Sequence, residues 1–92
     1  MLSYQSFLFK NSVLFKYCKG SSSLHFMLTK KYGNAVERNL FKRRARNIIK
    51  DPEVFSLVKR VDLFVKPLRP NISFSVLRES FVRLQEKLVK EQ

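Results

Sequence analysis

Hydrophobic positions in the first third of the chain follow the spacing of β-strands. Three apolar runs have strand length, and they cover residues 6–10, 13–19 and 24–29. The second run alternates between faces, so Val13, Phe15 and Tyr17 point to the same side. Because Asn11-Ser12 and Gly20-Ser21-Ser22 separate these runs and favour turns, we expect the three strands to be joined as hairpins.

From residue 35 the hydrophobic spacing becomes that of an α-helix, and it continues to about Lys50. The apolar arc of this helix consists of Val36, Leu40, Phe41, Ala45 and Ile48. The opposite arc is polar and strongly basic, and it consists of Arg38, Asn39, Lys42, Arg43, Arg46 and Lys50. Asn34 can cap the helix by accepting hydrogen bonds from its first N–H groups, and Pro52 lies just beyond its end.

The last third of the chain predicts one strand and a second helix. The strand is Val61–Lys66, and Pro67 and Pro70 close it with a rigid loop. Ser73 is the expected cap of a helix over Phe74–Lys90. This helix has a regular apolar stripe, which consists of Leu77, Phe81, Leu84 and Leu88.

The order of elements is therefore strand, strand, strand, helix, strand, helix, with residues 53–60 ambiguous between a loop and one helical turn. This order predicts an α+β fold, in which a small sheet carries the helices on one face. The strand–helix–strand unit would add a parallel pair and make the sheet mixed. A length of 92 residues fits a single domain over residues 1–92.

Cysteine usage and hydropathy indicate the setting of the protein. Cys18 is the single cysteine, so an internal disulfide is excluded and a reducing compartment is expected. Residues 1–20 lack the uncharged apolar stretch of a secretory signal, and no run approaches the roughly 18 apolar residues of a membrane span. We therefore predict a cytoplasmic protein that does not associate with membranes.

The net charge of +12 is concentrated in one segment. Residues 30–50 hold eight lysines and arginines against Glu37, so this segment contributes a net +7. A cationic surface of this density favours an anionic partner. Nucleic acid is the commonest such partner, and a negative membrane surface is the next.

Within this segment Arg38, Lys42 and Arg46 form a basic ladder. Because they are four residues apart, they lie on successive turns of one helix face, about 6 Å from one another. This spacing suits successive phosphates of an RNA strand, and arginine contacts phosphate in a planar, bidentate way. The face lacks the interleaved acids of a solvated, salt-bridged helix, which favours the interpretation that it binds RNA. Lys30 and Lys31 precede the helix, where exposed N–H groups also attract anions.

The same segment resembles the signature of the bacterial ribonuclease P protein family. The matching residues have unbroken spacing, and they are Thr29-Lys30-Lys31, Gly33-Asn34-Ala35-Val36, Arg38-Asn39, Lys42-Arg43 and Arg46. Two positions depart from the family pattern, because Leu40 stands where arginine is usual and Asn47 where glutamate is usual. The predicted strand, proline-bearing loop and amphipathic helix after the motif agree with the order of elements in the family.

The resemblance implies a fold like domain 2 of ribosomal protein S5. Family members usually carry an N-terminal helix before the strands. Here 28 residues precede Thr29 and predict strands, so we expect that helix to be reduced or absent. The resemblance also implies an endoribonuclease complex whose RNA subunit is the catalyst and binds the Mg²⁺ ions that generate the nucleophilic hydroxide. The protein would be an accessory subunit that holds this RNA and precursor tRNA together during removal of the 5′ leader.

The resemblance also implies roles for single residues. Contacts with the RNA subunit are expected from Arg38, Asn39, Lys42, Arg43 and Arg46. Lys30, Lys31 and Asn34 would lie close to the leader or its metal sites. The sheet face that carries Phe15 and Tyr17 would stack leader bases. We expect no catalytic residue, no metal or cofactor bound by the protein alone, and no obligate protein partner.

Two other functions are compatible with the sequence. A structural RNA-binding protein, similar to a ribosomal protein, would use the same ladder without a role in cleavage. A basic helix that acts on membranes or DNA is the third possibility. A protein-borne active site is not expected, since His25, the single histidine, fits an ordinary strand residue and the acids Asp51, Glu53 and Asp62 are scattered.

Overall fold

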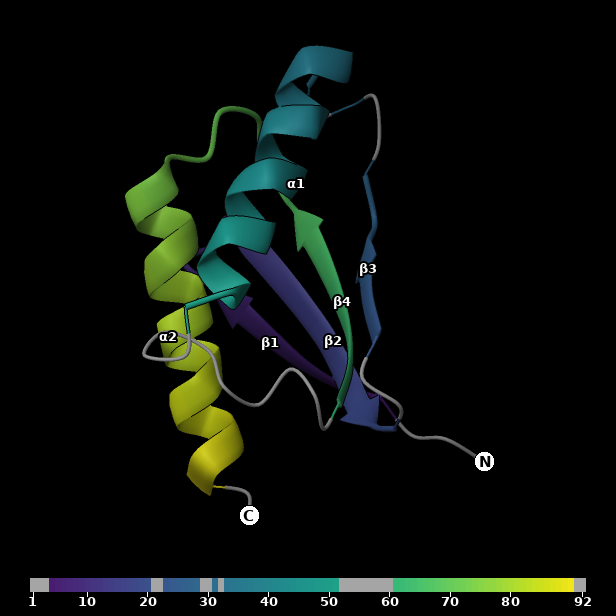
Figure 1. Ribbon diagram of the computed structural model, residues 1–92, viewed down its shortest axis with the longest axis vertical. Coiled ribbons are helices and arrows are strands. Elements are labelled where there is room, and N and C mark those ends of the chain that lie inside the picture. The colour runs from purple at the N-terminus through teal and green to yellow at the C-terminus, as the bar shows by residue number, and fades with distance from the viewer. Residues whose placement is uncertain (1–3, 21–22, 29–30, 32, 52–60, 91–92) are drawn as a thin grey trace.

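The computed structural model describes residues 4–20, 23–28, 31, 33–51 and 61–90, which form one sheet and two helices (Figure 1). In chain order the elements are β1 (Gln5–Phe9), β2 (Val13–Lys19), β3 (Ser23–Phe26), α1 (Ala35–Ile49), β4 (Val61–Pro67) and α2 (Phe74–Lys90). The predicted α+β class and order of elements are confirmed, with shifts of one to three residues at the strand ends. The ambiguous segment 53–60 lies outside the described residues.

The sheet is mixed and has the strand order β1-β2-β4-β3. β2 pairs antiparallel with both β1 and β4, whereas β3 and β4 form the parallel pair that the sequence predicted. The predicted hairpin at Gly20-Ser21-Ser22 is wrong, because β4 lies between β2 and β3. Turn residues allow the chain to reverse its direction, but they do not determine which strands pair with each other. β4 has seven residues, against four in β3, and buries every second one against the helices, which favours an interior place for β4 and an edge place for β3.

The hairpin between β1 and β2 is confirmed. Lys10 and Asn11 have φ values of 47° and 53°, the positive values that a tight turn between antiparallel strands requires. The N–H of Ser12 donates to the carbonyl of Phe9 at 2.8 Å and closes this turn. The turn thereby sets the register in which Phe7 lies opposite Phe15.

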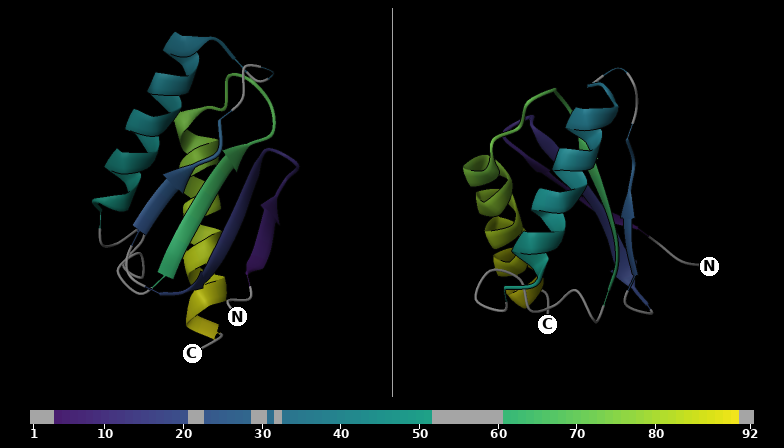
Figure 2. Two further views of the ribbon diagram at one scale, coloured as in Figure 1. Left: turned by 90° about the vertical axis from the view of Figure 1, so that its right-hand side faces the viewer. Right: turned by 45° about the horizontal axis from the view of Figure 1, so that its top comes forward.

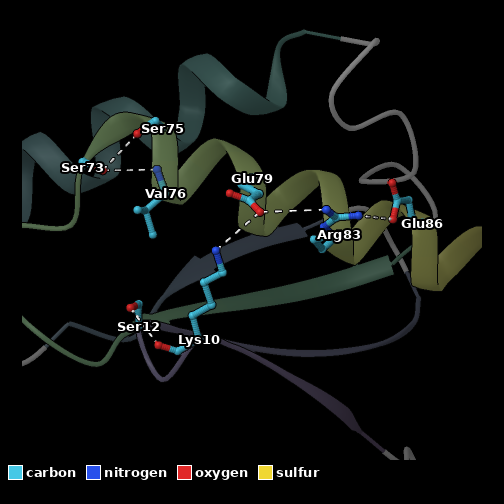
Figure 3. A network of polar contacts seen from close by, with 8 residues as sticks. All are labelled: Lys10, Ser12, Ser73, Ser75, Val76, Glu79, Arg83 and Glu86. Carbon is cyan, nitrogen blue, oxygen red and sulfur yellow. Dashed lines mark hydrogen bonds and ion pairs between the residues drawn. The ribbon is translucent and has the colours of Figure 1, made fainter.

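Both helices lie on one side of the sheet, and the core fills the space between them and the strands (Figure 2). Phe15 of β2 meets Phe81 of α2 edge to face, with ring centroids 5.0 Å apart. Ser73 caps α2 as predicted, since its hydroxyl accepts a hydrogen bond of 3.2 Å from the N–H of Val76 (Figure 3). The predicted stripe of α2 is confirmed, because all of its members are buried: Leu77, Phe81, Leu84 and Leu88.

The apolar arc of α1 is shorter than its sequence indicated. Its buried residues are Phe41, Ala45 and Ile48. Leu40 is half-buried, and Val36 is 75% exposed. The first turn of α1 extends beyond the end of the sheet, as Figure 1 shows, so this turn has no strand to pack against.

An ion pair connects α2 with the turn between β1 and β2, and two others lie within α2 (Figure 3). The ammonium of Lys10 lies 3.7 Å from a carboxylate oxygen of Glu79. Arg83 lies 4.0 Å from the same oxygen and 3.2 Å from Glu86. Exposed pairs of this kind contribute at most about 1 kcal/mol each, so the buried apolar side chains dominate the stability of the fold.

Candidate nucleic-acid interface

The residues before α1 fix where the helix begins. Gly33 has a φ of 141°, a value that residues with a side chain rarely adopt. Asn34 caps the helix as predicted, since its side-chain oxygen accepts a hydrogen bond of 2.9 Å from the N–H of Glu37. Lys31 is exposed just ahead of this cap. Lys30 lies outside the described residues, so its role stays a prediction.

The basic ladder (Arg38, Lys42 and Arg46) lies on the side of α1 next to β3. The guanidinium of Arg46 sits over the ring of Phe26, 5.6 Å from its centroid. Arg38 and Lys42 are half-buried, and Nε of Arg38 donates to the carbonyl of Asn34 at 3.4 Å. The ion pairs described above all involve α2, and none of them involves the ladder. Its positive charges are therefore not neutralised by acids in this part of the fold.

A groove runs between the ladder and β3. It encloses about 370 Å³ and is lined by Phe26, Leu28, Ala35, Arg38, Asn39 and Lys42. The structure thus brings three of the predicted RNA-contacting residues together beside an aromatic ring. Arg43 is exposed elsewhere on the polar side of α1. Cationic donors next to an aromatic face are the combination that binds a phosphate and its base together.

The structure corrects the expectation that Phe15 and Tyr17 stack leader bases. Phe15 is fully buried and Tyr17 is 3% exposed, so neither ring is accessible to a base. Both lie on the inner face of β2, where the larger set of apolar side chains packs beneath the helices. The hydroxyl of Tyr17 donates to the side chain of Gln5 at 3.2 Å, which satisfies its polar end inside the fold.

A set of accessible aromatic residues lies on the opposite face of the sheet, which we call the outer face. There the ring of Phe64 stacks on His25 with centroids 4.7 Å apart, and Tyr4 meets Phe64 edge to face at 5.6 Å. Lys16 lies opposite Phe64 in the pairing of β2 with β4 and is exposed. Sequence reasoning missed this set. The alternation within Val61–Lys66 could have revealed Phe64, because this residue falls on the opposite face from Leu63 and Val65.

Polar contacts hold this aromatic row in place. Ser23 donates to the carboxylate of Asp62 at 2.6 Å, and Nε2 of His25 lies 3.1 Å from the Ser23 hydroxyl. A hydrogen bond with the Cys18 side chain, followed by partial burial and the nearby charges of Cys18 and Asp62, raises the pKa of Tyr4 above its ordinary value. The raised pKa further favours the neutral phenol form of Tyr4.

The described residues offer neither a metal site nor a membrane-spanning helix. Among the described residues, no three His, Cys, Asp or Glu side chains lie close enough together to hold a metal ion. None of the described helices is long and apolar enough to cross a membrane. The basic ladder, the groove beside it and the outer face are thus the features on which a function can be argued.

Comparison with known proteins agrees with this geometry. The family model described as Ribonuclease P matches residues 3–89. The chain is also similar to a protein of Phytoplasma australiense named "Ribonuclease P protein component", with 32% identity over 88 residues that cover 85% of this chain and 72% of the relative. No solved structure shows a significant similarity to the chain.

Proposed function

This chain belongs to the ribonuclease P protein family, and on that premise we propose that it binds the RNA subunit of the enzyme through the basic ladder and the 5′ leader of precursor tRNA across the outer face. As a ribonuclease P protein it takes part in an endoribonuclease complex that processes tRNA. We thus assign the two RNA contacts to two separate surfaces of the protein. The cytoplasm is the proposed location, since precursor tRNA is processed there in bacteria.

The observation that carries the proposal is the groove beside the ladder. Arg38, Asn39 and Lys42 line it together with the ring of Phe26. Because α1 is anchored by its buried face, these donors are held in position before RNA arrives. A preorganised cationic face binds with a smaller ordering cost than a mobile tail. Arginine and lysine at this spacing suit the phosphates of the RNA subunit.

The outer face supports the second contact. The leader is single-stranded, so its bases are unpaired and can stack on aromatic rings. Phe64 and His25 form a pair of stacked rings there, and Lys16 adds a positive charge opposite Phe64. These residues take the role that the sequence resemblance had suggested for Phe15 and Tyr17.

We further propose that the RNA subunit carries out the cleavage and binds the Mg²⁺ ions that activate water. The protein would supply positive charge where the RNA subunit and the precursor tRNA repel one another. Mg²⁺ also screens this repulsion, so the contribution of the protein should be largest when Mg²⁺ is scarce.

The test is cleavage of precursor tRNA by a bacterial ribonuclease P RNA at low Mg²⁺, with and without the protein. We expect the protein to raise the cleavage rate at low Mg²⁺ and to have a smaller effect at high Mg²⁺. RNA binding without any stimulation would instead favour a structural RNA-binding protein, an alternative that Leu40 supports because it removes one basic residue from the family pattern.

A further inference from the structure

A second pocket lies on the other side of Arg38, between α1 and the loop from β4 to α2. It encloses about 320 Å³, the lower end of the roughly 300–1,000 Å³ typical of small-molecule sites. Its floor is apolar and consists of Leu28, Leu40, Phe41, Pro67 and Ile72. An opening of this size with an apolar floor suits one flat ring system, but it offers no advantage to a bare phosphate.

The rim of this pocket carries three arginines, Arg38, Arg44 and Arg69. Nη1 of Arg44 donates to the carbonyl of Ile72 at 2.9 Å, which fixes the plane of its guanidinium at the rim. This contact gives the charged end of Arg44, which precedes the buried Ala45, a polar partner. Guanidinium planes stack on flat rings and pair with phosphates, so the rim suits an occupant that is both aromatic and anionic.

Asn71 and Glu37 add groups that can contact the edge of a ring. Asn71 has a φ of 56° in the loop, and its side chain lines the pocket. An amide offers both a donor and an acceptor, and the carboxylate of Glu37 offers acceptors only. Such a mixture matches the edge of a nucleobase. The chain of a lipid would leave these groups and the arginines without partners.

We infer that this pocket binds one unstacked base of the RNA partner, with the adjoining backbone phosphates contacting Arg38 and Arg69. The inference rests on the proposed RNA binding and adds a site to it. Leu40 is central to the argument, because this chain has an apolar side chain where the family pattern has arginine. Leu40 therefore adds apolar surface to the floor for a base, where an arginine would have added a contact with a phosphate.

Two variants test the site by binding to a bacterial ribonuclease P RNA over a salt series. Leu40→Ala removes part of the floor and should weaken binding about five- to tenfold, the lower part of the range for a lost base contact. Asn71→Gly removes the amide and keeps the positive φ available, so it should fold normally and weaken binding a few-fold. Because neither variant removes a charge, both should keep the wild-type dependence of affinity on salt.

Two further variants make the result decisive. Val36→Ala lies one turn earlier on α1, where it is 75% exposed and outside the pocket, and it should bind as tightly as the wild type. Arg46→Ala, a ladder variant, should instead lower the salt slope by about one. Wild-type affinity in both pocket variants, with melting curves that show them folded, would overturn the base site while leaving the ladder intact. A wild-type protein that does not bind this RNA would overturn the proposed function itself.

Discussion

At the scale of single residues, position along a strand decides which aromatic side chain is buried in the core and which is accessible on the surface. Phe15 and Phe64 belong to neighbouring strands, yet Phe15 is fully buried beneath α2 whereas Phe64 lies on the outer face. Successive side chains of a strand point to opposite faces, so aromatic residues of similar chemistry separate into the two roles. Residue type alone does not reveal which ring is accessible to a binding partner.

Replacing Phe64 by leucine tests the role of the outer face. The variant keeps an apolar side chain but loses the flat ring, and one lost base stack costs about 1–3 kcal/mol. We expect at least a fivefold weaker affinity for a short single-stranded RNA that mimics a leader, measured by fluorescence anisotropy. Binding of a folded ribonuclease P RNA should change little.

A matched control for this variant lies on α2. Val89 is 55% exposed on the helix layer, away from the outer face, so Val89→Ala should leave both affinities unchanged. If Phe64→Leu weakened the binding of both RNAs to the same extent, the assignment of the leader to the outer face would be wrong.

At the scale of elements, local signals predicted the helices well and the strand partners poorly. Both caps, Asn34 and Ser73, were predicted because a cap depends on residues within one turn of itself. The place of β4 between β2 and β3 depends on residues about 40 positions apart, such as Ser23 and Asp62. The stacking of His25 on Phe64 follows from that pairing, so no local pattern of the sequence contained it.

The cap of α1 provides a prediction about stability. Asn34→Ala should lower the free energy of unfolding by about 1 kcal/mol, because the N–H of Glu37 loses its acceptor. In a domain of this size that corresponds to a fall in melting temperature of roughly 4–8 °C. Asn34→Gly should cost only a few tenths of a kcal/mol. Equal losses for the two variants, measured by circular dichroism, would show that the side-chain oxygen is not what stabilises the start of the helix.

At the scale of the whole molecule, charge and core are separated. The core lies between the sheet and the helices, whereas the ladder and the outer face lie on the surface of the molecule. A net charge of +12 on 92 residues repels itself in the folded protein. The concentration of positive charge in one segment could be predicted from the sequence, because it does not depend on the order of the strands.

Salt should therefore act in opposite directions on stability and on binding. Screening relieves the repulsion between cationic side chains, so the melting temperature of the free protein should rise as salt increases from about 50 to 500 mM. Over the same range the affinity for RNA should fall, because the release of counterions into a more concentrated salt solution is less favourable. A melting temperature that falls over this range would show that attractive ion pairs, rather than repulsion, dominate the charge balance of the fold.

The most direct test of the account is the salt dependence of binding to ribonuclease P RNA for the double variant Arg38→Ala/Arg46→Ala. Each lost phosphate contact should lower the slope of log affinity against log salt by about one, so the double variant should lose about two. Arg83→Ala, which removes a charge already paired with Glu79 and Glu86, should keep the wild-type slope. A folded double variant with an unchanged slope would contradict the assignment of RNA binding to the basic ladder.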